Sequence, residues 1–163
     1  MNYLSIEMNK IKLIFCLLII GLSSCSDSSN QNILDSDNYD TKEERVEVLK
    51  KEIKSFSEFE NAEFELFNVN GFSNSRKMVP GATSLDYKFA IKVNPSEVDK
   101  WTDGLIAIES DNYDYNWMKK IIKKRTNDWR MDSEPEFYTR KGDNVIMIVY
   151  RSEGVIFKRV INY

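Results

Sequence analysis

Residues 85–93 alternate between apolar and polar side chains, and this pattern constrains the fold more than any other sequence feature. The apolar positions are Leu85, Tyr87, Phe89, Ile91 and Val93. Because successive side chains of a strand point to opposite faces of a sheet, the alternation predicts a strand buried on one face only. One-sided burial is typical of antiparallel sheets, so we expect a sheet of that kind.

The C-terminal part of the chain supplies the expected partners of this strand. Residues 145–150 are apolar on both faces, which favours a central strand. Ser152-Glu153-Gly154 predicts a turn, and residues 155–161 return as the paired strand. With shorter strands expected over 62–69 and 137–140, the sheet has about four or five strands.

Three helices are expected beside these strands. Thr41 and Glu44 form a capping box, and apolar side chains at three- and four-residue spacing continue the first helix over 41–56. Asn94-Pro95 begins a second helix, and a third covers about 113–125. The order of elements predicts an α+β fold: an antiparallel sheet with about three helices packed on one side.

The N-terminal residues 1–24 indicate a signal peptide rather than part of the fold. A basic stretch precedes an apolar run over 13–21, which is too short to span a membrane as a helix of about 20 residues. Leu22-Ser23-Ser24-Cys25 follows and resembles the lipobox of bacterial lipoproteins. The resemblance implies cleavage before Cys25 and lipidation of that cysteine, which anchors the protein to a membrane. The alternative is an ordinary secretory signal, and the acidic Glu7 suggests that translation starts at Met8.

Residues 25–40 are polar and rich in Ser and Asp, which predicts a flexible tether ahead of a single α+β domain over 41–163. The segment Ser26-Asp27-Ser28-Ser29 resembles the surface-export signal of lipoproteins from the Bacteroidota. That resemblance implies an outer-membrane protein, with the cell surface favoured over the periplasmic face.

The mature part also resembles a group of small uncharacterised bacterial proteins, many of them lipoproteins. The shared features are the segment at 78–84 with Pro80, Ala82 and Thr83, the strand after it, the helix beginning at Pro95, the tryptophan segment at Trp129 and the terminal hairpin. The resemblance covers about 78–163. It implies the fold and carries no assigned activity.

Several kinds of chemistry are excluded by the residues that the chain lacks. It has no histidine, which excludes Ser-His-Asp and Cys-His catalysis and any zinc site that needs imidazole. Both cysteines, Cys16 and Cys25, lie near the start, and the net charge of −3 provides no basic excess for nucleic acid. We therefore expect no metal, no cofactor, no nucleic-acid partner and no enzymatic activity. A carboxylate-dependent hydrolase using Asp132, Glu134 and Glu136 is the remaining enzymatic alternative.

Candidate binding residues lie between positions 120 and 138. Trp129 and Arg130 fall in an expected polar loop, and Tyr138 follows, so these side chains are candidate anchors for a protein or a glycan. Lys120 and Lys124 belong to a basic cluster with Lys119, Lys123 and Arg125. This cluster either binds an anionic partner or is the solvated face of a helix. The sequence therefore predicts a lipid-anchored interaction module. The alternative is an immunity protein against a toxin delivered to the envelope.

Overall fold

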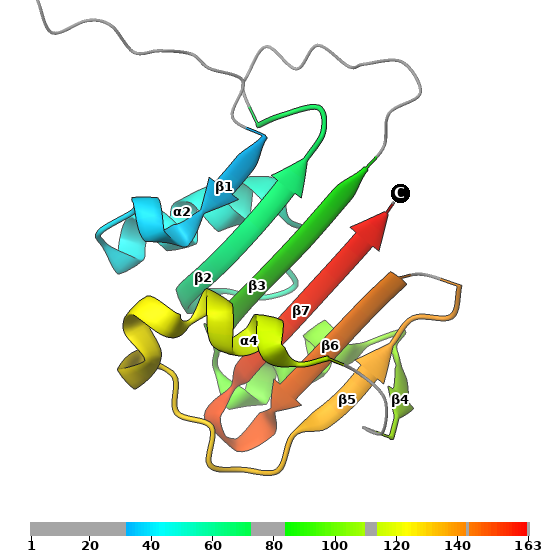
Figure 1. Cartoon of the computed structure of the whole chain (residues 1–163). Helices are drawn as coiled ribbons and strands as arrows, with labels where there is room; N and C mark the ends of the chain where they lie inside the picture. Colours follow the sequence, from blue (N-terminus) through cyan, green and yellow to red (C-terminus); the bar gives the residue numbers. More distant parts are fainter. Residues whose placement is uncertain (1–31, 73–83, 110–113, 143, 163) are drawn as a thin grey trace, which may run out of the picture.

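The computed structural model describes residues 32–72, 84–109, 114–142 and 144–162, and these contain a seven-stranded sheet (Figure 1). Every neighbouring pair is antiparallel, in the order β1-β2-β3-β7-β6-β5-β4. The strands are β1 (Ile33–Asp35), β2 (Phe59–Asn68), β3 (Leu85–Val93), β4 (Ile106–Ile108), β5 (Glu136–Thr139), β6 (Asn144–Tyr150) and β7 (Val155–Asn162). The mixed α and β class and the antiparallel sheet are confirmed. The expected four or five strands were too few because the edge strands β1 and β4 have three residues each.

The predicted alternating strand is β3, and it lies in the middle of the sheet between β2 and β7. The predicted hairpin is β6 and β7, joined through Gly154 in a left-handed conformation with φ of 66°. Burial of β3 on one face only was wrong, because Ala90 is fully buried on the face opposite to Phe89 and Ile91.

Short helices connect the strands. The α-helices are α2 (Lys42–Glu52), α3 (Val98–Thr102) and α4 (Asn116–Ile121), and the 3-10 helices are η1 (Ser36–Asn38), η2 (Pro95–Glu97), η3 (Lys123–Asp128) and η4 (Arg151–Glu153). The capping box of α2 is confirmed: the Glu44 amide donates to the Thr41 hydroxyl, and the Thr41 amide donates to the Glu44 carboxylate.

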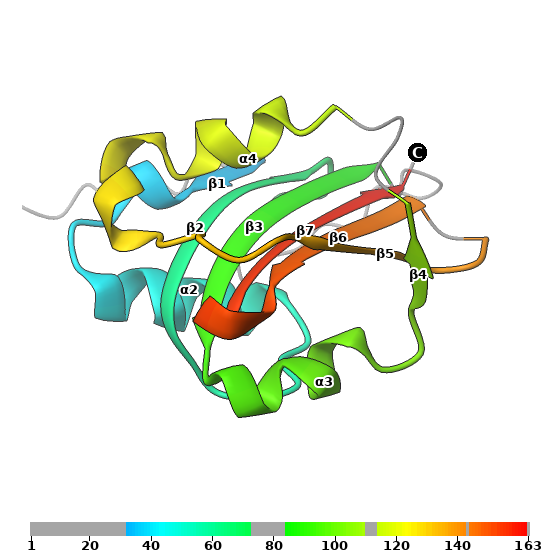
Figure 2. The same cartoon turned by 90° about the horizontal axis from the view of Figure 1, so that it is seen from below.

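The helices cover both faces of the sheet, so the prediction that they pack on one side was wrong. Figure 2 shows α2 and α3 on one face and α4 with η3 on the other. Leu49 of α2 and Trp101 of α3 pack in one core, whereas Trp117 of α4 packs in a second core with Phe157. The physical reason is that the central strands carry apolar side chains on both faces, and each face must be covered.

The expected tether over 25–40 was too long, because its last part is folded. Residues 33–35 form β1, which pairs with β2 from Ile33 opposite Phe67 to Asp35 opposite Glu65. Leu34 is 8% exposed and belongs to the core beside α2. The earlier part of the expected tether lies outside the described residues, as do the signal peptide and Cys25.

A buried ion cluster fixes this segment to the rest of the fold. The carboxylate of Glu63 on β2 is fully buried, and the Ser36 hydroxyl of η1 donates to it at 2.6 Å. Arg125 of η3 donates to both oxygens of the Glu63 carboxylate, and Nε of the buried Arg45 lies 3.4 Å from one of them. Four elements, η1, α2, β2 and η3, therefore meet at the buried Glu63 carboxylate.

Candidate functional site

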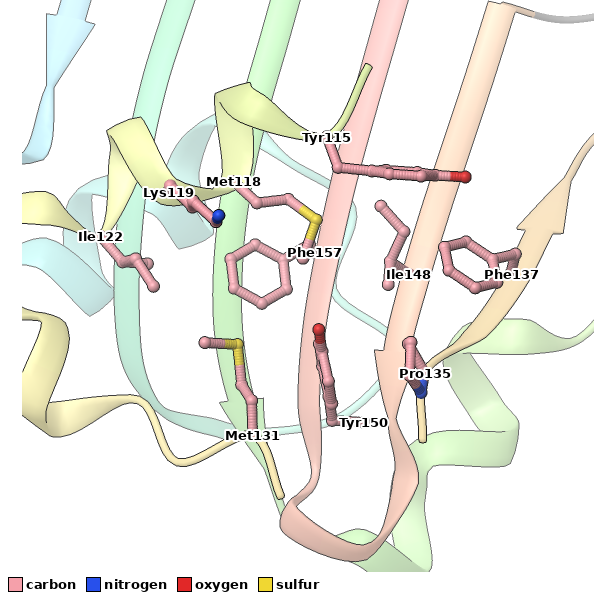
Figure 3. Close-up of a pocket in the computed structure, with 10 residues that line it drawn as sticks. All are labelled: Tyr115, Met118, Lys119, Ile122, Met131, Pro135, Phe137, Ile148, Tyr150 and Phe157. Carbon is pink, nitrogen blue, oxygen red and sulfur yellow. The ribbon is translucent and has the colours of Figure 1, made fainter. Parts of the chain in front are cut away.

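An apolar pocket of about 210 Å³ lies beside α4, on the face of the sheet that this helix shares with η3 (Figure 3). Its floor is formed by β6 and β7, where Ile148 and Phe157 are paired across the strands. The walls come from α4, from the loop after η3 and from β5. The side chains that Figure 3 shows around the opening include Tyr115, Met118, Lys119, Met131, Phe137 and Tyr150.

The pocket exists because α4 is too short to cover its face of the sheet. The helix has six residues, packs mainly against β3, and its Trp117 also contacts Phe157 of β7. None of the described helices extends over β5 on this face (Figure 2), and Pro135, Phe137 and Ile148 line the pocket there. Apolar surface that no helix covers is left open to a ligand or a partner.

Three lining side chains carry a polar group, namely Tyr115, Lys119 and Tyr150. The Tyr150 hydroxyl points toward its centre (Figure 3) and makes no hydrogen bond with any other described residue. Burial raises the pKa of this phenol, and the negative charge of Glu153 raises it further, so it remains a protonated donor. The exposed Lys119 supplies a cation from α4.

Trp129 is not the exposed anchor that its polar neighbours suggested. Its side chain is 3% exposed and packs against Phe157, with ring centroids 6.3 Å apart. The end of η3 turns the chain back toward the sheet, because the Trp129 amide donates to the Thr126 carbonyl. The buried indole Nε1 has no hydrogen-bond partner among the described residues.

All three tryptophans of the chain are buried, at 2% exposure for Trp101, 6% for Trp117 and 3% for Trp129. Sugar-binding sites use exposed aromatic faces for stacking. The prediction of a glycan ligand depended on an exposed Trp129, so the burial of this side chain removes its main support.

Arg130 and Tyr138 do not meet in a common site either. Arg130 is exposed and pairs with Asp132. Tyr138 contacts the core on the opposite face of the sheet, where its hydroxyl donates to Glu136 and accepts from Arg151. Successive residues of β5 point to opposite faces, so Phe137 reaches the pocket and Tyr138 does not.

Four of the five residues of the predicted basic cluster are exposed, namely Lys119, Lys120, Lys123 and Lys124. We call these four residues the lysine ridge. The fifth, Arg125, is bound to Glu63. Within the described ranges, Lys119, Lys120 and Lys123 form no ion pair, and Lys124 donates to the Asp37 carbonyl at 2.7 Å. The ridge meets the pocket at Lys119, a juxtaposition that reasoning from the sequence missed.

Two of the three acids of the hydrolase alternative, Asp132 and Glu136, have other contacts, and the third, Glu134, is exposed. Asp132 pairs with Arg130, and Arg151 donates to both oxygens of Glu136 at 2.7 and 2.8 Å. The Arg151 hydrogen bonds hold the pKa of Glu136 below its ordinary value. A glycosidase acid needs a raised pKa, so Glu136 is not suited to that role. In the part of the chain that the structure describes, His, Cys, Asp and Glu side chains form no group of three suited to a metal ion.

No protein-family model, curated protein or solved structure matches this chain.

Proposed function

We propose that this protein is a lipid-anchored envelope protein whose domain is a non-catalytic binding module, with the pocket beside α4 as its contact site. The observation that carries this proposal is the position of an apolar pocket next to the exposed lysine ridge. An apolar depression with a few polar groups is the usual form of a binding site.

The proposed anchor is the lipid on Cys25, in the outer membrane and on the cell surface rather than on the periplasmic face. The described fold begins at Asn32, whose carbonyl accepts from the Asn68 amide. Seven residue steps from Cys25 to Asn32 span at most about 25 Å of extended chain. The domain is therefore held close to the membrane. None of the described helices is long and apolar enough to cross a bilayer.

The anchor is tested by the mass of the N-terminal peptide and by fractionation of cells that carry Cys25→Ala. We expect a lipidated peptide beginning at Cys25, and loss of membrane attachment in the variant but not in the control Cys16→Ala. Digestion of the domain by protease added to intact cells supports surface display. A mature protein with an unmodified Cys25 would overturn the anchor.

The binding site is tested by site-specific photo-cross-linking in growing cells. Benzoylphenylalanine replaces Lys120 on the lysine ridge or, as the control, the exposed Lys51 of α2 on the opposite face. We expect a discrete adduct from position 120 and none from position 51. Mass spectrometry of the adduct then identifies the partner. An envelope component supports the binding module, and a toxin supports the alternative of an immunity protein. Absence of an adduct at position 120, or equal adducts from both positions, would refute the proposed site.

A further inference from the structure

We propose that the pocket receives one tyrosine side chain from an acidic segment of a partner protein, and that the acids of this segment lie along the lysine ridge. This inference rests on the proposed function and gives the chemistry of the partner. It follows from the size of the pocket, from the Tyr150 hydroxyl, which makes no hydrogen bond within the described residues, and from the charge beside the pocket.

The size of the pocket suits one side chain. Its volume of about 210 Å³ exceeds the roughly 150 Å³ of an engineered apolar cavity that holds benzene. It is smaller than the roughly 300–1,000 Å³ of sites that enclose whole small molecules. Aromatic side chains that fill a pocket of this kind supply much of the binding energy of protein interfaces.

The lining selects an aromatic ring with a polar tip. Met118 and Met131 enter from opposite sides of the pocket, and methionine sulfur makes favourable contacts with aromatic rings. Between them the Tyr150 hydroxyl has no hydrogen bond within the described residues. A polar group that a partner covers requires a hydrogen bond, which a tyrosine supplies and a phenylalanine does not.

The charge around the pocket selects an acidic sequence. Lys119, Lys120 and Lys123 are exposed without an acidic partner among the described residues, in a chain whose net charge is −3. These local cations continue from the pocket along α4 and η3. A single carboxylate at the pocket would engage Lys119 alone, whereas an acidic peptide reaches the whole ridge. Complementary charge of this kind sets the register and the association rate of protein partners.

The test uses the full mature lipoprotein in phosphatidylcholine nanodiscs, because detergent would compete for an apolar pocket. The probe is a fluorescein-labelled twelve-residue peptide of Gly, Asp and Glu with one central Tyr, followed by fluorescence polarisation. Replacing the Tyr by Ala should weaken binding at least tenfold, and replacing it by Phe about threefold to tenfold. Replacing the acids by amides should weaken binding at least fivefold and remove its dependence on salt.

Variants of the protein locate the contacts. Tyr150→Phe should remove the preference for Tyr over Phe in the peptide, while the binding of the Phe peptide stays within twofold. Lys120→Glu should weaken binding about threefold to tenfold, and the control Lys51→Glu should leave it unchanged. Because Tyr150→Phe keeps the ring and Lys120 is exposed, both variants should melt like the wild type, which is checked by circular dichroism.

Equal binding of the Tyr and Ala peptides would overturn this inference. Displacement of the Tyr peptide by micromolar octanoate, with no difference between the Tyr and Ala peptides, would instead assign the pocket to a free fatty acid. If no peptide binds while position 120 still cross-links in cells, the inference fails and the proposed function stands. If neither the peptide binding nor the cross-link is observed, both this inference and the proposed binding site are refuted.

Discussion

Neutralising Glu63 is the change that most directly tests the buried ion cluster. The Glu63 carboxylate is fully buried and accepts hydrogen bonds from Ser36 and Arg125. In Glu63→Gln the negative charge disappears, while Arg45, which is 2% exposed, keeps its positive charge. Removing one partner of a buried ion pair costs about 3–5 kcal/mol, because the remaining charge is left without compensation. We therefore expect the free energy of unfolding to fall by that amount.

A matched control lies two residues along the same strand. Glu65 also pairs with a cation, Lys88, but its side chain is 45% exposed, and Lys88 retains Asp86 as a second partner. Glu65→Gln should therefore cost less than about 1 kcal/mol. The assay is urea unfolding followed by circular dichroism and by tryptophan fluorescence, with equal slopes required for the comparison.

The same cluster holds β1, so Glu63→Gln should also loosen this strand. The amides of residues 33–37 should exchange with solvent faster in the variant than in Glu65→Gln. A loss of less than 1 kcal/mol for Glu63→Gln, or unchanged exchange in β1, would refute the reasoning that one buried charge joins these segments.

Three further changes test other parts of the structure, each by urea unfolding. Gly154→Ala should lower the free energy of unfolding by at least about 3 kcal/mol, because the new Cβ would lie 2.1 Å from the Val93 carbonyl oxygen. The control Gly142→Ala is also at positive φ but in open space, and it should lower the free energy of unfolding by about 1 kcal/mol. Similar losses in the two variants would refute the close approach at Gly154. Leu34→Ala should lower the free energy of unfolding by about 2 kcal/mol. An unchanged free energy of unfolding would show that Leu34 is not part of the core and belongs to a flexible tether. Burial, with the nearby charge of Arg140, lowers the pKa of Lys158 to about 8. The unfolded chain therefore holds this proton more tightly, and stability should rise between about pH 8 and 10. Lys158→Met should be more stable than the wild type by about 1–3 kcal/mol at pH 7, with little advantage near pH 10, and an advantage independent of pH would contradict the shifted pKa.

The sequence predicted the elements whose signal is local. The alternation over residues 85–93 identified β3, and Thr41 with Glu44 identified the start of α2. It could not show that both faces of the sheet are covered. The small Ala90 lies at a position that local alternation assigned to the solvated face, and only the packing of α4 reveals its burial.

Segments with little local signal were missed. Strand β1 has three residues, too few for a period to be visible, and its polar neighbours suggested a tether. Trp129 lies among polar residues, and tertiary packing against Phe157 decides its burial. The pocket joins Met118, Phe137 and Tyr150 from three different elements, so no motif in the sequence marks it.

The measurement that tests the central claim most directly is photo-cross-linking from position 120 in cells whose pocket is filled. Met131 points into the pocket (Figure 3), and Met131→Trp replaces its thioether chain by a larger indole ring that fills the pocket. The control Lys51→Trp adds the same ring on the opposite face. If the pocket receives the partner, the adduct from position 120 falls at least fivefold in Met131→Trp and is unchanged in Lys51→Trp, with both variants folded. An undiminished adduct in Met131→Trp would show that the partner does not use the pocket.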